Sequence, residues 1–101
     1  MIDRLRERIG LYRAVKTPDS QGGSIRDWHF AFAAWAAVEG LGTTTQSESG
    51  RTLKRYRITL RHRTDVPNTA RLSWRGQTLA VRAVDDPDLR RERLHLICEE
   101  L

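Results

Sequence analysis

The segment GLGTTTQSESGRTLKRYRITLRHR, residues 40–63, is the part of the chain that best indicates the fold. Its first part, residues 40–50, holds three glycines, five serines or threonines and one charged residue. Residues 51–63 carry six Lys or Arg, one His and no acid. Within this basic part Tyr56, Ile58 and Leu60 alternate with polar residues, and a period of two is that of a β-strand. The segment therefore predicts a polar loop that leads into a strand with one apolar face.

The other face of this strand carries a row of arginines: Arg55, Arg57, Arg61 and Arg63. Three interpretations are open. The arginines could contact the phosphates of a polyanion, or they could pair with acids of a neighbouring subunit. They could also be solvated, because exposed strand faces often carry Lys or Arg, which discourage edge-to-edge pairing.

The sequence on both sides of this segment also alternates and is divided by turn signals. Residues 29–41 are rich in alanine, which favours a helix, but their alternation and their neighbours favour a strand over 34–39. The chain is therefore predicted to be all-β, a small barrel or sandwich of about six to seven antiparallel strands with a long loop between the middle strands. The aromatic residues fall at strand positions and are expected in the core. The expected strands are 8–15, 25–30, 34–39, 53–63, 70–74, 77–84 and 93–99.

The length of 101 residues predicts one domain, 1–101, with a mobile loop at about 40–53. A hydrophobic content of 39% favours a folded domain over disorder. The net charge of +5 points to nucleic acid, an anionic membrane surface or an acidic protein as partner. No apolar run approaches the roughly 20 residues of a membrane span, and the N-terminus does not resemble a signal peptide. We therefore expect a cytoplasmic protein with no membrane partner.

The charge is unevenly distributed along the chain. Residues 1–16 hold five Lys or Arg against two acids, whereas residues 85–101 hold three against six. Patches of opposite sign suit head-to-tail contacts between copies of one chain. The residues expected at such an interface are Arg4, Arg6, Arg8, Asp85, Asp86, Asp88, Arg90 and Arg91.

The sequence lacks the patterns of catalysis and of cofactor or metal binding. Its three histidines and single cysteine have no metal-ligand spacing, and Cys98 is expected to be a buried thiol. No phosphate-binding glycine loop is present. We therefore expect no enzyme, no cofactor and no metal site. Base-specific recognition is not expected either, because there is no recognition helix and no aromatic RNA-binding motif.

Several short motifs, in this order and at this spacing, are similar to those of one family. The chain resembles the small head–tail joining proteins of long-tailed phages, also called head-completion, stopper or connector proteins. The resemblance runs nearly end to end. It is carried by Leu5-Arg6-Glu7-Arg8-Ile9, the DxxGG-like Asp19 to Gly23 followed by Trp28, Trp35-Ala36-Ala37-Val38-Glu39, Tyr56 to Arg61, Arg71 to Gly76, Val84 to Asp88 with Arg90-Arg91, and Leu94 to Glu99.

The resemblance implies a small β-barrel that assembles as a ring of 6 or 12 copies, with each copy contributing its loop to a central channel. Such a ring lies between the portal or adaptor and the tail terminator or tail tube protein, in the neck of the particle. It joins head to tail and helps to retain packaged double-stranded DNA without sequence specificity. Prophage-derived gene transfer agents use similar proteins. The residues expected to face the channel are Gly42, Thr43, Thr44, Thr45, Gln46, Ser47, Arg51, Lys54, Arg55, Arg57 and Arg61.

The alternative is a small basic β-barrel that binds single-stranded nucleic acid by itself. This function requires exposed aromatic side chains beside arginines, on which bases can stack. Tyr56 is predicted on the face opposite Arg55 and Arg57, which disfavours the alternative.

Overall fold

The computed structural model describes residues 5–18, 20–45, 49–67 and 69–101. In these residues the chain forms six β-strands and no helix. The sequence predicted the positions of most of them to within a few residues. The strands are β1 (Glu7–Pro18), β2 (Ser24–Thr45), β3 (Thr52–Arg61), β4 (Ala70–Trp74), β5 (Gln77–Asp85) and β6 (Arg93–Glu100).

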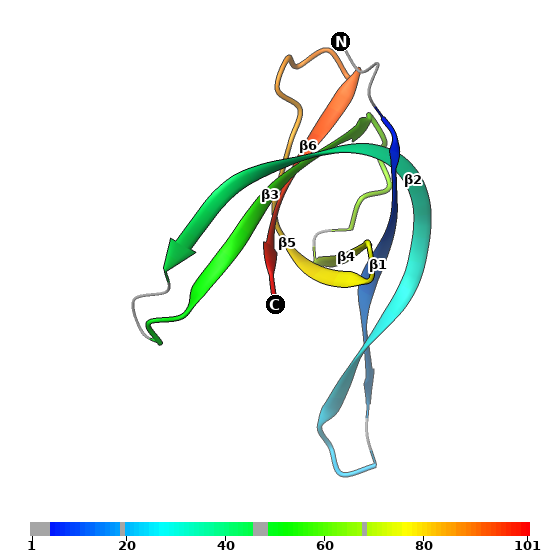
Figure 1. Cartoon of the computed structure of the whole chain (residues 1–101). Helices are drawn as coiled ribbons and strands as arrows, with labels where there is room; N and C mark the ends of the chain where they lie inside the picture. Colours follow the sequence, from blue (N-terminus) through cyan, green and yellow to red (C-terminus); the bar gives the residue numbers. More distant parts are fainter. Residues whose placement is uncertain (1–4, 19, 46–48, 68) are drawn as a thin grey trace.

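The strands close into a barrel in the order β1-β2-β3-β6-β5-β4 (Figure 1). Every neighbouring pair is antiparallel, including β1 with β4, which closes the barrel. Closure gives the strands partners on both sides over the central part of the barrel. The predicted all-β fold of six to seven antiparallel strands is thus confirmed.

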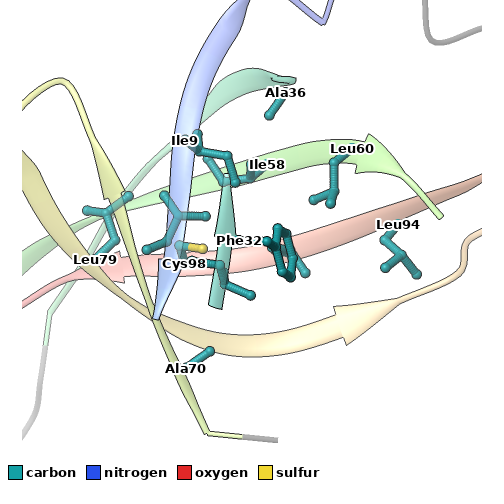
Figure 2. Close-up of a cluster of buried hydrophobic side chains, with 12 residues drawn as sticks. Ile9, Phe32, Ala36, Ile58, Leu60, Ala70, Leu79, Leu94 and Cys98 are labelled. Atoms are coloured by element: carbon teal, nitrogen blue, oxygen red, sulfur yellow. The ribbon is translucent and has the colours of Figure 1, made fainter. Parts of the chain in front are cut away.

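The core lies inside the barrel and takes alternate residues from every strand (Figure 2). Ile58 and Leu60 of the basic strand are buried, as the alternation predicted, and Tyr56 packs against the core from its edge. Cys98 is also fully buried. The buried cluster comprises Ile9, Leu11, Phe32, Ala36, Ile58, Leu60, Ala70, Leu72, Leu79, Leu94, Leu96 and Cys98.

The pairing of β1 with β2 contains a β-bulge. Leu11 pairs with Phe32 and Tyr12 with Phe30, so Ala31 is the extra residue. Because of the extra residue, side chains of β2 two positions apart across the bulge lie on opposite sides of the sheet. Phe32 is buried, whereas Phe30 is 58% exposed, although both would face the same side of a regular strand. The expectation that the aromatic residues belong to the core is therefore wrong for Phe30, and also for Trp35, which is 54% exposed.

β2 is one continuous strand of 22 residues, where two separate strands were expected. Its first half pairs with β1 and its second half with β3. The two hairpins project from the barrel in different directions (Figure 1), which helps to give the molecule extents of 50 × 34 × 26 Å. We call them the β1–β2 arm (Val15–Pro18 with Ser24–Asp27) and the β2–β3 arm (Gly40–Thr45 with Thr52–Tyr56).

Candidate functional site

The β2–β3 arm occupies most of the segment that was expected to be a mobile loop at 40–53. Thr43, Thr44 and Thr45 pair with Lys54, Leu53 and Thr52, so the ladder continues beyond the barrel. Gly42 has a φ of 84° at the register shift between Gly40 and Thr43, a conformation that glycine adopts without strain. The loop assignment was wrong for this part because three consecutive β-branched threonines favour a strand. Gln46 and Ser47 lie outside the described residues.

The basic residues of β3 lie along this arm and the adjoining barrel wall, and acids of the same chain accompany several of them. Arg57 forms an ion pair with Glu39 at 3.0 Å. Arg55 lies 3.6 Å from Glu99, which also accepts a hydrogen bond from Arg82 at 3.0 Å. The Lys54 backbone N–H donates to Glu100 at 2.9 Å. These contacts add a fourth interpretation of the arginine row, in which its arginines pair with acids of the same chain.

Three further basic residues of this region differ from one another. The Arg51 guanidinium donates to the backbone carbonyl of Leu101. Arg61 is exposed and, in the part of the chain that the structure describes, has no ion pair. The Arg63 guanidinium stacks over the Phe32 ring at 3.6 Å and donates two hydrogen bonds of 2.8 Å to Asp65. This hydrogen bonding lowers the pKa of Asp65. Arg63 therefore covers one side of the core instead of extending the arginine row.

The acidic residues expected at a subunit interface lie in and beside the turn between β5 and β6. Asp86 accepts hydrogen bonds from the backbone N–H groups of Leu89, at 3.1 Å through its carbonyl, and of Arg91, at 3.0 Å through its carboxylate. Asp88 pairs with Arg93 at 3.0 Å. Asp86 and Asp88 therefore hold the shape of the turn. Asp85, Arg90 and Arg91 are exposed and form no ion pair within residues 69–101 or the other described ranges.

The basic residues expected at the same interface lie at the start of β1. Arg6 lies just before the strand, and the Arg8 guanidinium stacks over the Trp35 ring at 5.1 Å. No ion pair among the described residues joins them to Asp85, Asp86 or Asp88, so any pairing of the two patches is between molecules. Arg4 lies outside the described residues.

The outer surface of β4, β1 and β2 carries a feature that the sequence analysis missed. The β1–β2 pairs Arg8–Trp35, Tyr12–Phe30 and Ala14–Trp28 share this side of the sheet, with Arg71 of β4 opposite Tyr12. Arg71 stacks over Trp28 at 4.3 Å, and the rings of Tyr12 and Phe30 meet edge to face at 5.5 Å. We call this surface the aromatic face. It consists of Arg8, Tyr12, Trp28, Phe30, Trp35 and Arg71.

Glu7 forms a second cluster that sequence reasoning did not single out. Its Oε1 accepts hydrogen bonds from Arg75 Nε and from Trp74 Nε1, both at 2.8 Å. These two bonds, that from Arg75 first, lower the pKa of Glu7. Tyr56 packs edge to face on Trp74 at 5.2 Å, beside a cavity of about 450 Å³. The only signal in the sequence was the Arg75-Gly76 turn, which places Arg75 beside the start of β1.

The His, Cys, Asp and Glu side chains of the described residues are not clustered for metal binding. No group of three or more His, Cys, Asp or Glu among them could hold a metal ion. Burial raises the pKa of Cys98 to about 12, which makes its thiol a poor nucleophile. Burial, followed by the charges of Arg57 and Arg93, lowers the pKa of His95. A search of the described residues for helices long and apolar enough to cross a membrane finds none.

The family of the chain follows from comparison with known proteins. Residues 1–101 match the model of the phage head completion proteins. The chain belongs to this family. The resemblance inferred from the motifs is thus confirmed, and the role it supports is a structural one in joining head and tail. The family is one of virion structural proteins and not of enzymes.

Two solved structures share the fold of this family member. A chain from the virion of a native gene transfer agent particle is 19% identical with a TM-score of 0.75, over 99% of this chain and 94% of that one. The solution structure of protein SF1141 from Shigella flexneri 2a is 26% identical with a TM-score of 0.71, over 96% and 93% respectively. No curated protein matches the chain.

Proposed function

We propose that copies of this chain form a ring in the neck of a phage-like particle, between the portal or adaptor and the tail. The ring joins head to tail and helps to retain the packaged DNA. Membership of the head completion family supports the head–tail role. The mechanism is mechanical and electrostatic, in keeping with a family of virion structural proteins.

The observation that carries the proposal is the β2–β3 arm, which extends beyond the barrel as a paired hairpin (Figure 1). In a ring, each copy can direct this arm into the central channel. Its described threonines are polar and small, so a set of arms would narrow the channel without a hydrophobic plug. A two-stranded ribbon has little stability of its own, so we expect the arms to become ordered by contact with their neighbours.

The electrostatics of the arginine row suit a channel through which DNA must pass. Duplex DNA carries one negative charge per about 1.7 Å of its axis. Arg55 and Arg57 are already accompanied by Glu99 and Glu39, which weakens their hold on phosphates. Lys54, Arg61 and Arg51 retain exposed side chains for loose, sequence-independent contacts. The DNA is then guided without being bound tightly.

A shortened arm tests the proposal. Replacing residues 45–52 by Asn-Gly connects Thr44 to Leu53 by a two-residue hairpin turn. These two residues are already partners in the β2–β3 pairing. The matched control replaces residues 18–24 by Asn-Gly, which joins Thr17 to Ile25 in the β1–β2 arm. We expect particles with the shortened β2–β3 arm to lose DNA or fail to take tails, as measured by nuclease-protected DNA and electron microscopy. Normal DNA retention in these particles would contradict the role of the arm.

The alternative, a nucleic-acid-binding module, gains support from the aromatic face. Trp35 and Trp28 lie beside Arg8 and Arg71, the combination on which single-stranded bases stack. A gel-shift titration with single- and double-stranded DNA separates the two functions. Tight binding of single strands by the free chain at physiological salt, abolished by Trp35→Ala, would support the alternative.

A further inference from the structure

The β-bulge at Ala31 determines where Phe30 points. Without it, Phe30 and Phe32 would lie on the same side of β2, and both would face the core. With it, Phe30 is turned outward and stays 58% exposed beside Tyr12. Exposing a large aromatic ring to water is unfavourable, and bulges commonly re-aim a side chain for a purpose. The position of Phe30 therefore indicates a surface that is covered in use.

The rest of the aromatic face has the composition of a protein interface. Tryptophan, tyrosine and arginine are the residues most enriched at the energetic centres of such interfaces. Trp35 is 54% exposed, and the guanidinium groups of Arg8 and Arg71 lie over tryptophan rings. None of the six residues is acidic, so the face is cationic. Its occupant should therefore present an apolar surface with a negative charge beside it.

The inner side of β5, where it is exposed at one end of the barrel, presents such a surface, because Val81 and Val84 pair with the buried Cys98 and Leu96. A cavity of about 320 Å³ is lined mainly by apolar side chains of β5 and of the connection between β3 and β4, which are Val66, Pro67, Val81, Ala83 and Val84. Val84 is 46% exposed. Asp85 follows it, exposed and with no ion pair among the described residues. Arg82, which also lines the cavity, is paired with Glu99. We call this surface the β5 hollow.

The two surfaces lie on different sides of the barrel. In the closed order β1-β2-β3-β6-β5-β4, two strands separate β2 from β5 in either direction. Contact between different surfaces of identical copies is head-to-tail, and it closes into a ring when the rotation between copies allows.

We propose that the aromatic face of one copy docks into the β5 hollow of the next, with Phe30 and Trp35 against Val84 and with Asp85 near Arg8 or Arg71. This inference rests on the proposed ring and specifies which surfaces form it. The complementary charge and the exposed apolar side chains on both surfaces favour a second copy as the occupant over a nucleic acid.

Substitution of Phe30 tests the contact. Phe30→Asp places a carboxylate at the centre of the aromatic face, and Ile25→Asp is the matched control, since Ile25 is 55% exposed on the β1–β2 arm. Both side chains are exposed, so both variants should fold. We expect Phe30→Asp to reduce the number of tailed, DNA-filled particles about tenfold or more, as for an interface hot spot, and Ile25→Asp to leave it within about twofold of wild type. Equal effects of the two variants would overturn the interface.

A disulfide cross-link tests the geometry independently. The double variant Phe30→Cys/Val84→Cys, oxidised within particles, should give a ladder of covalent multimers on a non-reducing gel, whereas either single variant should give dimers at most. Cys98 is fully buried and does not interfere. If electron microscopy shows a ring but the gel shows no covalent multimers, the proposed interface is wrong, whereas the proposed ring is still supported. A neck that contains a single copy would overturn both the interface and the ring.

Discussion

Glu7 shows how one carboxylate connects distant parts of the chain. It accepts hydrogen bonds from Trp74 and Arg75, which are 67 and 68 residues away in sequence. These bonds attach the turn between β4 and β5 to the start of β1, next to the pairing that closes the barrel. Because they favour the ionised carboxylate, the pKa of Glu7 is below its ordinary value of 4.5.

We predict that Glu7→Gln lowers the stability of the barrel in a pH-dependent way. A depressed pKa stabilises the folded state above the ordinary pKa, and this contribution is lost as the pH falls through the folded value. The difference in urea midpoint between wild type and Glu7→Gln should therefore be present at pH 7 and decrease steadily below pH 4.5. Asp27→Asn, an exposed acid outside all the observed ion pairs, serves as control. A difference that stays constant down to pH 2 would contradict the role of the Glu7 charge.

Among the elements, β2 is the one that the sequence describes least completely. Its two halves were predicted as separate strands, 25–30 and 34–39, because the alanine-rich residues 29–41 are ambiguous between helix and strand. The structure has a bulge between the two halves, where one extra residue is accommodated without ending the ladder. Local pattern cannot distinguish a bulge from a loop, because the difference depends on the partner strand.

Two single-residue deletions test the bulge. Deleting Ala31 removes the extra residue and leaves Phe32 inward and Phe30 outward, so we expect the free energy of unfolding to change by about 1 kcal/mol or less. Deleting Ala33 also yields a regular ladder, but it places Phe32 outside and Ala31 opposite Leu11. This loss of a buried phenylalanine should cost about 3–5 kcal/mol. Urea denaturation measures both, and equal losses would show that the bulge does not set the facing of Phe32.

Other elements were predictable from local signals. The apolar alternation of β6 and the short hairpin of β4 and β5 around Arg75-Gly76 gave their positions to within one or two residues. The buried positions of β3 followed in the same way. The partners of the β3 arginines could not be predicted from local signals. Glu39 and Glu99 come close to Arg57 and Arg55 only because β2 and β6 pair with β3. The aromatic face was missed for the same reason, since its members come from three strands.

For the whole molecule, the net charge of +5 overstates the positive charge available to a polyanion. The described ion pairs involve six arginines, of which Arg55 and Arg82 share Glu99. The free chain should therefore bind duplex DNA weakly and in a salt-dependent way.

We predict that Glu99→Gln strengthens this binding, because it leaves two arginines without their carboxylate. Each additional phosphate contact should steepen the dependence of log K on log salt by about 1. Glu92→Gln changes the net charge equally, but Glu92 is exposed and forms no ion pair within the described residues, so it should have a smaller effect. Fluorescence anisotropy at several salt concentrations gives both slopes. Identical slopes for the two variants would mean that the pairing with Glu99 does not restrain Arg55 and Arg82.

The length of β2 has a mechanical consequence. One strand of 22 residues, about 70 Å if fully extended, forms part of both projecting arms and wraps around the barrel between them. A force on one arm is therefore transmitted to the other along the continuous backbone of β2, with no loop between the two arms. The hydrogen bonds between β2 and its neighbouring strands are then loaded in shear. If one arm meets a neighbouring protein and the other meets DNA, tension from the packaged genome reaches the joint through this one strand.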